Sequence, residues 1–476
     1  MGITALTGAA APAAGQSTAG LSGEDAVLYK LVQRITFGVN DEEFALARTL
    51  GFEKYLEYHL SFEQIDDSSV LAMISGFTTL SMEPYQYYAL TDTGLPMRET
   101  AEAMLFRAVF SKRQLLERVV EFWTDHFNID QNKASFHKAI NDRDAIRTAA
   151  MTNFRNLLQK SATSPAMLIY LDNASSNASN GRSPNQNYAR ELMELHTLGV
   201  NGGYTQADVL AAAKALSGWT YYSSSADGVN RGKFRYNNAL HDQTAKTILG
   251  VAFPANQGQN DGNRLLDILA NHPSTIQFVC TKLFRYFLDY TPSQAALAPV
   301  MDAWVSSNGD IRTILGAILT RQNVMAAAPK YKRPLHLMVS GIRAVRATVT
   351  NFNTLRGTQL RLAGHIPYNW SPPNGYPDAY GYWVGLLLPR WNFGFRVTQT
   401  GSLAISGITS NVTSLVTGLT TANAIAQRIN QLLFQGSLPA ARVTALATYL
   451  GTGVPSAAKI RDAFGLALNL PEFQWV

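Results

Sequence analysis

Apolar residues recur at helical spacing along most of the chain and are separated by short polar or glycine-containing breaks. In the segment 111–127 the apolar side chains share one face with His126, and the charged side chains lie opposite. Capping signals mark several ends, for example Asn40 before a helix and Gly199 after one. The pattern predicts helices over residues 23–60 (with a break before 41), 97–110, 111–127, 137–160, 188–199, 206–217, 262–271, 274–288, 292–306, 311–321 and 334–348, and two or three more after residue 410.

These elements predict a mainly α fold: a single large multi-helix domain with αα-hairpins, long aromatic loops and at most minor β structure, between residues 221 and 250. No linker separates the pieces, so residues 24–476 are expected to form one helical domain. Residues 1–23 are rich in Ala, Gly, Ser and Thr, and we expect a flexible N-terminal segment or the remnant of a signal peptide there.

Composition narrows the classes of protein to consider. Only 16% of the 476 residues are charged, and the net charge is +6. The basic residues are scattered rather than gathered in a stripe, which argues against nucleic acid as a partner. Cys280 is the only cysteine, which excludes an intramolecular disulfide and a multi-cysteine zinc site. No apolar run is long enough for a transmembrane helix, and the low charge together with the N-terminal composition favours an exported protein.

One long motif carries a resemblance to a known family. The string PNQNYARELMELHTLGVNGGYTQADVLAAAKALSGW (184–219) resembles the signature block of the bacterial family of unknown function called DUF1800, and LVQRITFG (31–38), ERVVEFWTDHF (117–127) and HPSTIQFVCTKLFRYF (272–287) match in the same order. The resemblance implies export and a sulfatase-like exported protein as a partner, but no assigned activity. The chain departs from the family at Gln186, where Glu is common, and at Asp125, where Asn is frequent.

A polar helix face provides the first candidate chemistry. On a regular helix, Asn187, Arg190, Glu191 and Glu194 lie on one face. Two carboxylates three residues apart can raise each other's pKa, bind a divalent cation, or serve as acid and base on a sugar. The alternative is ordinary surface pairing, with Arg190 bound to Glu194 and Glu191 bound to a basic residue elsewhere. His196 falls on the opposite side, so we do not expect it to share a metal with the glutamates.

His126 is the second candidate, because an imidazole on an apolar helix face needs a partner. It is either a core histidine that donates to a carbonyl or to Glu191 or Glu194, or a general base or metal ligand beside those glutamates, with Trp123 as a wall of the site. His241 is a weaker candidate that would join a composite site.

Aromatic residues concentrate between residues 364 and 391, where the chain contains Trp370, Tyr376, Tyr380, Tyr382, Trp383 and Trp391. Such rings can stack on sugars and line a groove, or they can fasten a loop onto a core. As substrate-binding residues we propose Arg190, Asn187, Trp123, His241, Trp370, Tyr376 and Trp383.

The sequence therefore predicts an exported hydrolase that acts on a polymer, with a polysaccharide as the favoured substrate. Glu191 and Glu194 would be the catalytic carboxylates, and His126 would support them. One alternative is a His/carboxylate metal-dependent enzyme, redox enzymes included, and another is a non-catalytic binding or structural protein of the cell envelope. No P-loop, dinucleotide fingerprint or GxSxG motif is present, and the sequence names neither a cofactor nor a metal.

Overall fold

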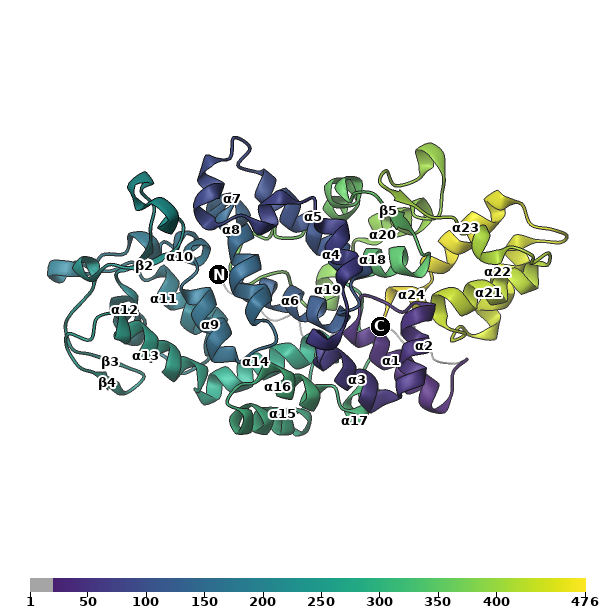
Figure 1. The fold of residues 1–476 in the computed structure, drawn as a ribbon. Coiled ribbons are helices and arrows are strands. Elements are labelled where there is room, and N and C mark those ends of the chain that lie inside the picture. Colours follow the sequence, from purple (N-terminus) through teal and green to yellow (C-terminus); the bar gives the residue numbers. More distant parts are fainter. Residues whose placement is uncertain (1–19) are drawn as a thin grey trace.

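The computed structural model describes residues 20–476 and is drawn in Figure 1. It is mainly α, as predicted; in the described part of the chain, strands occur in three two-stranded sheets. Figure 1 shows an elongated arrangement, with α12 and α13 near one end and α21 to α23 at the other. Along residues 20–476, no helix combines the length and apolar character that a membrane crossing requires.

The N-terminal half contains twelve α-helices in the described residues, besides short 3-10 and π-helical turns. They are α1 (Gly23–Ile35), α2 (Asp41–Leu50), α3 (Phe52–Leu60), α4 (Ser68–Ile74), α5 (Leu95–Phe110), α6 (Gln114–His126), α7 (Gln131–Ala134), α8 (His137–Ile140), α9 (Phe154–Ala162), α10 (Pro165–Tyr170), α11 (Asn187–Glu191) and α12 (Gln206–Leu216). The predicted cap of α2 is present, since the Asn40 side chain accepts a hydrogen bond from the Glu43 amide at 2.9 Å.

The rest of the chain begins with two small antiparallel hairpins. They pair β1 (Trp219–Tyr221) with β2 (Phe234–Tyr236) and β3 (Lys246–Ile248) with β4 (Val251–Phe253). The helices that follow are α13 (Gln259–Ala270), α14 (Pro273–Phe287), α15 (Gln294–Ser307), α16 (Ile311–Ile318), α17 (Arg321–Ala326), α18 (Pro334–Ala344), α19 (Tyr380–Trp383), α20 (Leu387–Arg396), α21 (Ala422–Phe434), α22 (Ala440–Leu450), α23 (Ala457–Leu468) and α24 (Pro471–Gln474). A last pair joins β5 (Thr348–Val349) to β6 (Ile408–Thr409).

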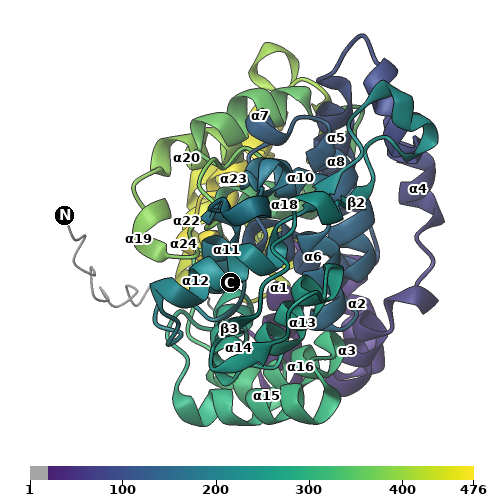
Figure 2. The ribbon, with the colours of Figure 1, turned by 90° about the vertical axis from the view of Figure 1, so that its left-hand side faces the viewer.

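Two large apolar clusters form the core. One gathers buried side chains of α1, α6, α9, α14 and α16, and the other gathers those of α5, α18 and α21 to α23. Helix α6 carries an apolar face, as its sequence predicts, and it lies between α5 on one side and α14 and α16 on the other in both views (Figures 1 and 2). Arg333, directly before α18, reaches across to α6, so the two clusters meet beside this helix.

The predicted αα-hairpin of residues 188–217 is present, but its first helix is not regular. Helix α11 continues as a π-helical turn, Leu192–Thr197, in which the Leu198 amide bonds to the Met193 carbonyl at 2.8 Å. The wider turn rotates the residues after Glu191 relative to a regular helix. The angular positions expected for Glu194 and His196 on a regular helix therefore do not apply.

Candidate functional site

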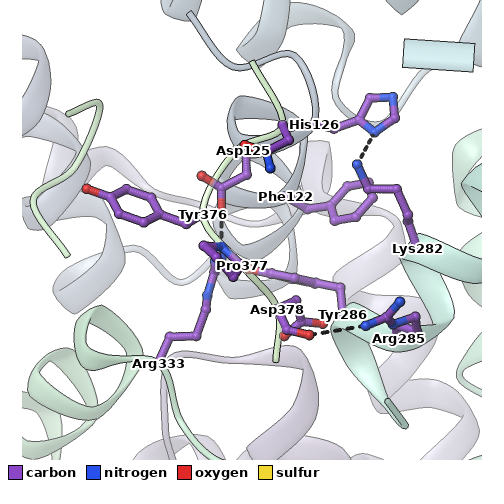
Figure 3. A pocket seen from close by; sticks show the side chains of 12 residues that line it. Phe122, Asp125, His126, Lys282, Arg285, Tyr286, Arg333, Tyr376, Pro377 and Asp378 are labelled. Atoms are coloured by element: carbon purple, nitrogen blue, oxygen red, sulfur yellow. Dashed lines mark hydrogen bonds and ion pairs between the residues drawn. The ribbon is translucent and has the colours of Figure 1, made fainter. Parts of the chain in front are cut away.

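A pocket with a volume of about 190 Å³ lies where α6, α14 and the aromatic loop meet (Figure 3). It is lined by Phe122, Asp125, His126, Lys282, Arg285, Tyr286, Arg333, Asn374, Gly375, Tyr376, Pro377 and Asp378. Each of the two helices contributes three of these side chains at positions i, i+3 and i+4, the spacing that places residues on one helical face. The pocket thus forms between faces of two helices that are distant in sequence, since His126 and Lys282 are 156 residues apart.

The segment 364–391, here called the aromatic loop, closes one side of the pocket because it docks on the end of α6. The Asn128 side chain donates to the carbonyl oxygens of Trp370 at 2.8 Å and Pro372 at 2.7 Å. Gly375 has φ +71° and packs so closely on the Asp125 backbone that a Cβ atom there would overlap the Asp125 carbonyl. Glycine at this position allows the loop to reach the helix.

His126 is buried and has two hydrogen-bond partners. Its Nε2 lies 3.0 Å from the His196 carbonyl oxygen, and its Nδ1 lies 2.9 Å from Lys282 Nζ (Figure 3). A carbonyl can only accept, so Nε2 carries the proton and Nδ1 accepts from the lysine. Burial, followed by the charge of Lys282, holds the pKa of His126 well below its usual value. The imidazole is therefore neutral and its tautomer is fixed.

The two cations of α14 form no ion pair with a carboxylate of the described residues. Burial lowers the pKa of Lys282 to about 8, and its Nζ contacts His126 and, at 5.4 Å, the ring of Phe278. Arg285 donates to the backbone carbonyl of Asp378 at 3.4 Å. Within residues 20–476, neither side chain lies within ion-pair distance of an acidic group.

The acidic side chains of the pocket, in contrast, are paired. Asp125 lies 2.6 Å from Arg333, and Asp378 lies 2.9 Å from Lys330. Burial raises the pKa of Asp125 above its usual value, although Arg333 opposes this effect. Each of these acids thus has a cation as its ion-pair partner, whereas Lys282 and Arg285 form no ion pair among residues 20–476, so the lining of the pocket carries an excess of positive charge.

The polar face of α11 lies apart from the lining of this pocket. Asn187, Arg190, Glu191 and Glu194 are all half-buried. Arg190 donates to Gln206 at 2.8 Å instead of pairing with Glu194, which accepts from Tyr204 at 3.2 Å. Burial and, second, the neighbouring Glu194 raise the pKa of Glu191. The two carboxylates are thus close enough to influence each other, but the partners of His126 are a carbonyl and a lysine rather than these glutamates.

Three of the predicted substrate-binding residues are buried and lie outside the pocket lining. Trp123 is fully buried and donates to the Ala150 carbonyl at 3.0 Å, and Trp383, also fully buried, donates to the Pro377 carbonyl at 2.7 Å. His241 lies between the Ser217 carbonyl and the Asp261 carboxylate. No face of these rings is open to a substrate in this structure.

The remaining aromatic residues divide between the two interpretations of the loop. Tyr376 lines the pocket and donates to the Ile366 carbonyl at 2.7 Å. Trp370 is half-buried beside Tyr376, with ring centroids 4.9 Å apart, while Tyr382 and Trp391 are exposed. Trp383 and Tyr380 pack with Tyr331 and Trp475 and so fasten the loop to the rest of the protein. Of the predicted aromatic set, Tyr376 alone contributes to the pocket lining in the described residues.

Sequence reasoning did not single out Lys282, Arg285, Arg333 or Asp378 as site residues. A signal was available for the first two, since they are cations three residues apart on an otherwise uncharged helix. This spacing does not reveal whether an acidic side chain lies near either cation in the folded protein. Among the described residues, no three His, Cys, Asp or Glu side chains are grouped so that they could hold a metal ion.

Comparison with known proteins yields one match. The family described as "Protein of unknown function (DUF1800)" matches residues 30–475. No curated protein and no solved structure matches the chain.

Proposed function

The chain belongs to the DUF1800 family, and we propose that it acts on a substrate bearing a carboxylate, sulfate or phosphate group, which Lys282 and Arg285 bind in the pocket between α6 and α14. The observation that carries this proposal is the pair of cations without acidic partners, next to two acids that have theirs. Holding two such cations in a partly buried pocket is unfavourable, and an anionic group would offset that cost.

The pair formed by Lys282 and His126 gives the pocket groups that can move a proton. A lysine whose pKa is about 8 exchanges its proton near neutral pH, and the neutral imidazole holds one of its N–H groups at 2.9 Å. Tyr376 and Phe122 supply apolar walls around these polar groups. This combination is typical of a site for acid–base chemistry on an anionic substrate.

Titration with sulfate, phosphate and acetate by isothermal calorimetry tests the proposal. We expect binding by the wild-type protein, and at least tenfold weaker binding by Lys282→Met and Arg285→Gln. Lys138→Met is the matched control, because the pKa of Lys138 is also lowered to about 8 by burial but its side chain lies outside the pocket. Equal affinities in the wild type and both pocket variants would contradict the proposal.

A polymer hydrolase with Glu191 and Glu194 as its carboxylates is the second candidate. The raised pKa of Glu191 beside Glu194 supports it, because a general acid must hold its proton near working pH. Glu191→Gln and Glu194→Gln should abolish cleavage of a polysaccharide panel while the protein stays folded, and full activity in both variants would rule it out. Export, a sulfatase-like partner, the metal-dependent enzyme and the non-catalytic envelope protein stay predictions from the sequence.

A further inference from the structure

Three buried lysines and the half-buried Lys282 share a property that favours reaction as a nucleophile. Burial lowers the pKa values of Lys138, Lys282 and Lys330 to about 8 and that of Lys332 to about 7. The neutral amine attacks electrophiles and the ammonium does not, so each of these lysines has a reactive fraction near neutral pH. Their surroundings decide which of them a ligand can reach.

Three of the four are unsuited to attack on a ligand. Lys330 is paired with Asp378 at 2.9 Å. Lys138 is 0% and Lys332 2% exposed, and neither lines the pocket. Lys282 is half-buried, lines the pocket and has no acidic partner among residues 20–476. Of these four lysines, it alone combines access with a free amine.

The neighbours of Lys282 fit a reaction with a carbonyl group. His126 Nδ1 accepts one N–H of the amine at 2.9 Å, which leaves the nitrogen lone pair free when the amine is neutral. Arg285 is three residues along the same helix face and can bind a carboxylate.

We propose that the ε-amine of Lys282 forms an imine with the carbonyl carbon of a small oxo acid, whose carboxylate is bound by Arg285. This inference rests on the proposed anion site and adds the class of ligand and a covalent step. The amine nitrogen adds to the carbonyl carbon and gives a carbinolamine, with transfer of a proton from nitrogen to oxygen. The hydroxyl group then takes up a proton from solvent and leaves as water, and the nitrogen loses its last proton to solvent as the C=N bond forms. One carbonyl oxygen leaves as water and no electrons are exchanged with another reagent.

Reductive trapping tests the imine. The full-length protein is incubated with pyruvate and sodium cyanoborohydride, which reduces an imine to a stable secondary amine, and the modified residue is located by peptide mass spectrometry. We expect preferential modification of Lys282, its loss in Lys282→Met, and its retention in Lys332→Met. Arg285→Gln should lower labelling by pyruvate at least tenfold but leave labelling by acetaldehyde within twofold, because acetaldehyde has no carboxylate.

The outcomes separate this inference from the proposed function. Sulfate that binds in the pocket should protect Lys282 from pyruvate in the wild-type protein, so the test does not depend on a variant that folds. If sulfate binds as proposed but Lys282 is labelled no faster than exposed lysines such as Lys54, the imine is wrong and the anion site stands. If neither sulfate binding nor labelling of Lys282 is found, both proposals are wrong.

Discussion

Replacing Arg333 by Met probes the charge network beneath the pocket. Arg333 forms ion pairs with both Glu121 and Asp125, and the Arg333 and Glu121 side chains are each 7% exposed. Met keeps much of the volume but removes the guanidinium. The variant therefore leaves two carboxylates with less compensation in a largely buried region.

The decrease in the free energy of unfolding depends on which partners Glu121 keeps in the variant. Removing one partner of a buried pair costs about 3–5 kcal/mol. Glu121 still has Arg118 at 2.9 Å and the Tyr286 hydroxyl at 2.6 Å, so we expect roughly 3 kcal/mol, the lower end of that range. An unfolding entropy of about 2.1 cal/mol/K per residue gives about 1 kcal/mol/K for 476 residues, so the Tm should fall by about 3 °C.

The stability difference between the wild type and Arg333→Met should also depend on pH. Burial opposes ionisation of Glu121, but Arg333 and Arg118 outweigh it and hold its pKa below the ordinary 4.5. A carboxyl group with a lowered folded pKa contributes stability above its unfolded pKa and loses it as pH falls through the folded value. The difference between wild type and Arg333→Met should therefore be full at pH 7 and narrow as the pH falls below about 4.5.

Scanning calorimetry at pH 7 and at pH values below 4.5 measures both effects. Arg48→Met is the matched control: its ion pair with Asp25 is exposed, and such pairs contribute about 0–1 kcal/mol. If Arg333→Met melts within the range of Arg48→Met at pH 7, the three-charge network does not stabilise the fold and the reasoning is refuted.

Three further predictions concern the pocket and its surroundings. Gly375→Ala should destabilise the protein by about 1–3 kcal/mol and weaken sulfate binding, because φ is +71° and the new Cβ overlaps the Asp125 backbone. Scanning calorimetry measures the stability and calorimetric titration measures the sulfate affinity. If both are unchanged, the aromatic loop does not dock on α6 as described. Sulfate affinity should fall as the pH rises through about 8, where Lys282 loses its proton, and labelling by pyruvate should rise over the same range. If affinity and labelling change in the same direction, Lys282 is not both the anion-binding group and the nucleophile. Asp261→Asn removes the nearer of the two buried acidic partners of Lys246 and leaves Asp242 at 3.6 Å. It should cost about 3 kcal/mol in urea unfolding but leave sulfate affinity unchanged.

The sequence was most informative where structure depends on neighbours along the chain. The spacing of apolar residues predicted α6 and its buried face, and the cap at Asn40 was predicted from side-chain chemistry alone. The αα-hairpin that ends in α12 was predicted in the same way, and in the structure α12 begins with a capping box at Thr205. The π-helical turn Leu192–Thr197 was missed, because the apolar pattern of one short turn does not distinguish four from five residues.

For the candidate site the sequence supplied side chains but not their partners. It indicated that His126 needed a hydrogen-bond partner, and the structure provides the His196 carbonyl and Lys282. The second of these is 156 residues away, a separation over which periodicity carries no information. The sequence favoured Glu191 and Glu194 as site residues because they lie on one face of a single helix. Whether Lys282 and Arg285 of α14 form ion pairs depends on the neighbouring elements, and only the structure shows those.

The sequence by itself determined that this protein is mainly α, because helix periodicity and capping are local properties of the chain. Only the tertiary structure decided which charges are paired. Asp125 and Asp378 form ion pairs with cations from distant segments, whereas Lys282 and Arg285 form none among residues 20–476. The physical reason is that the electrostatic energy of a buried charge depends on the groups within a few ångströms of it, and folding, not sequence order, brings those groups together.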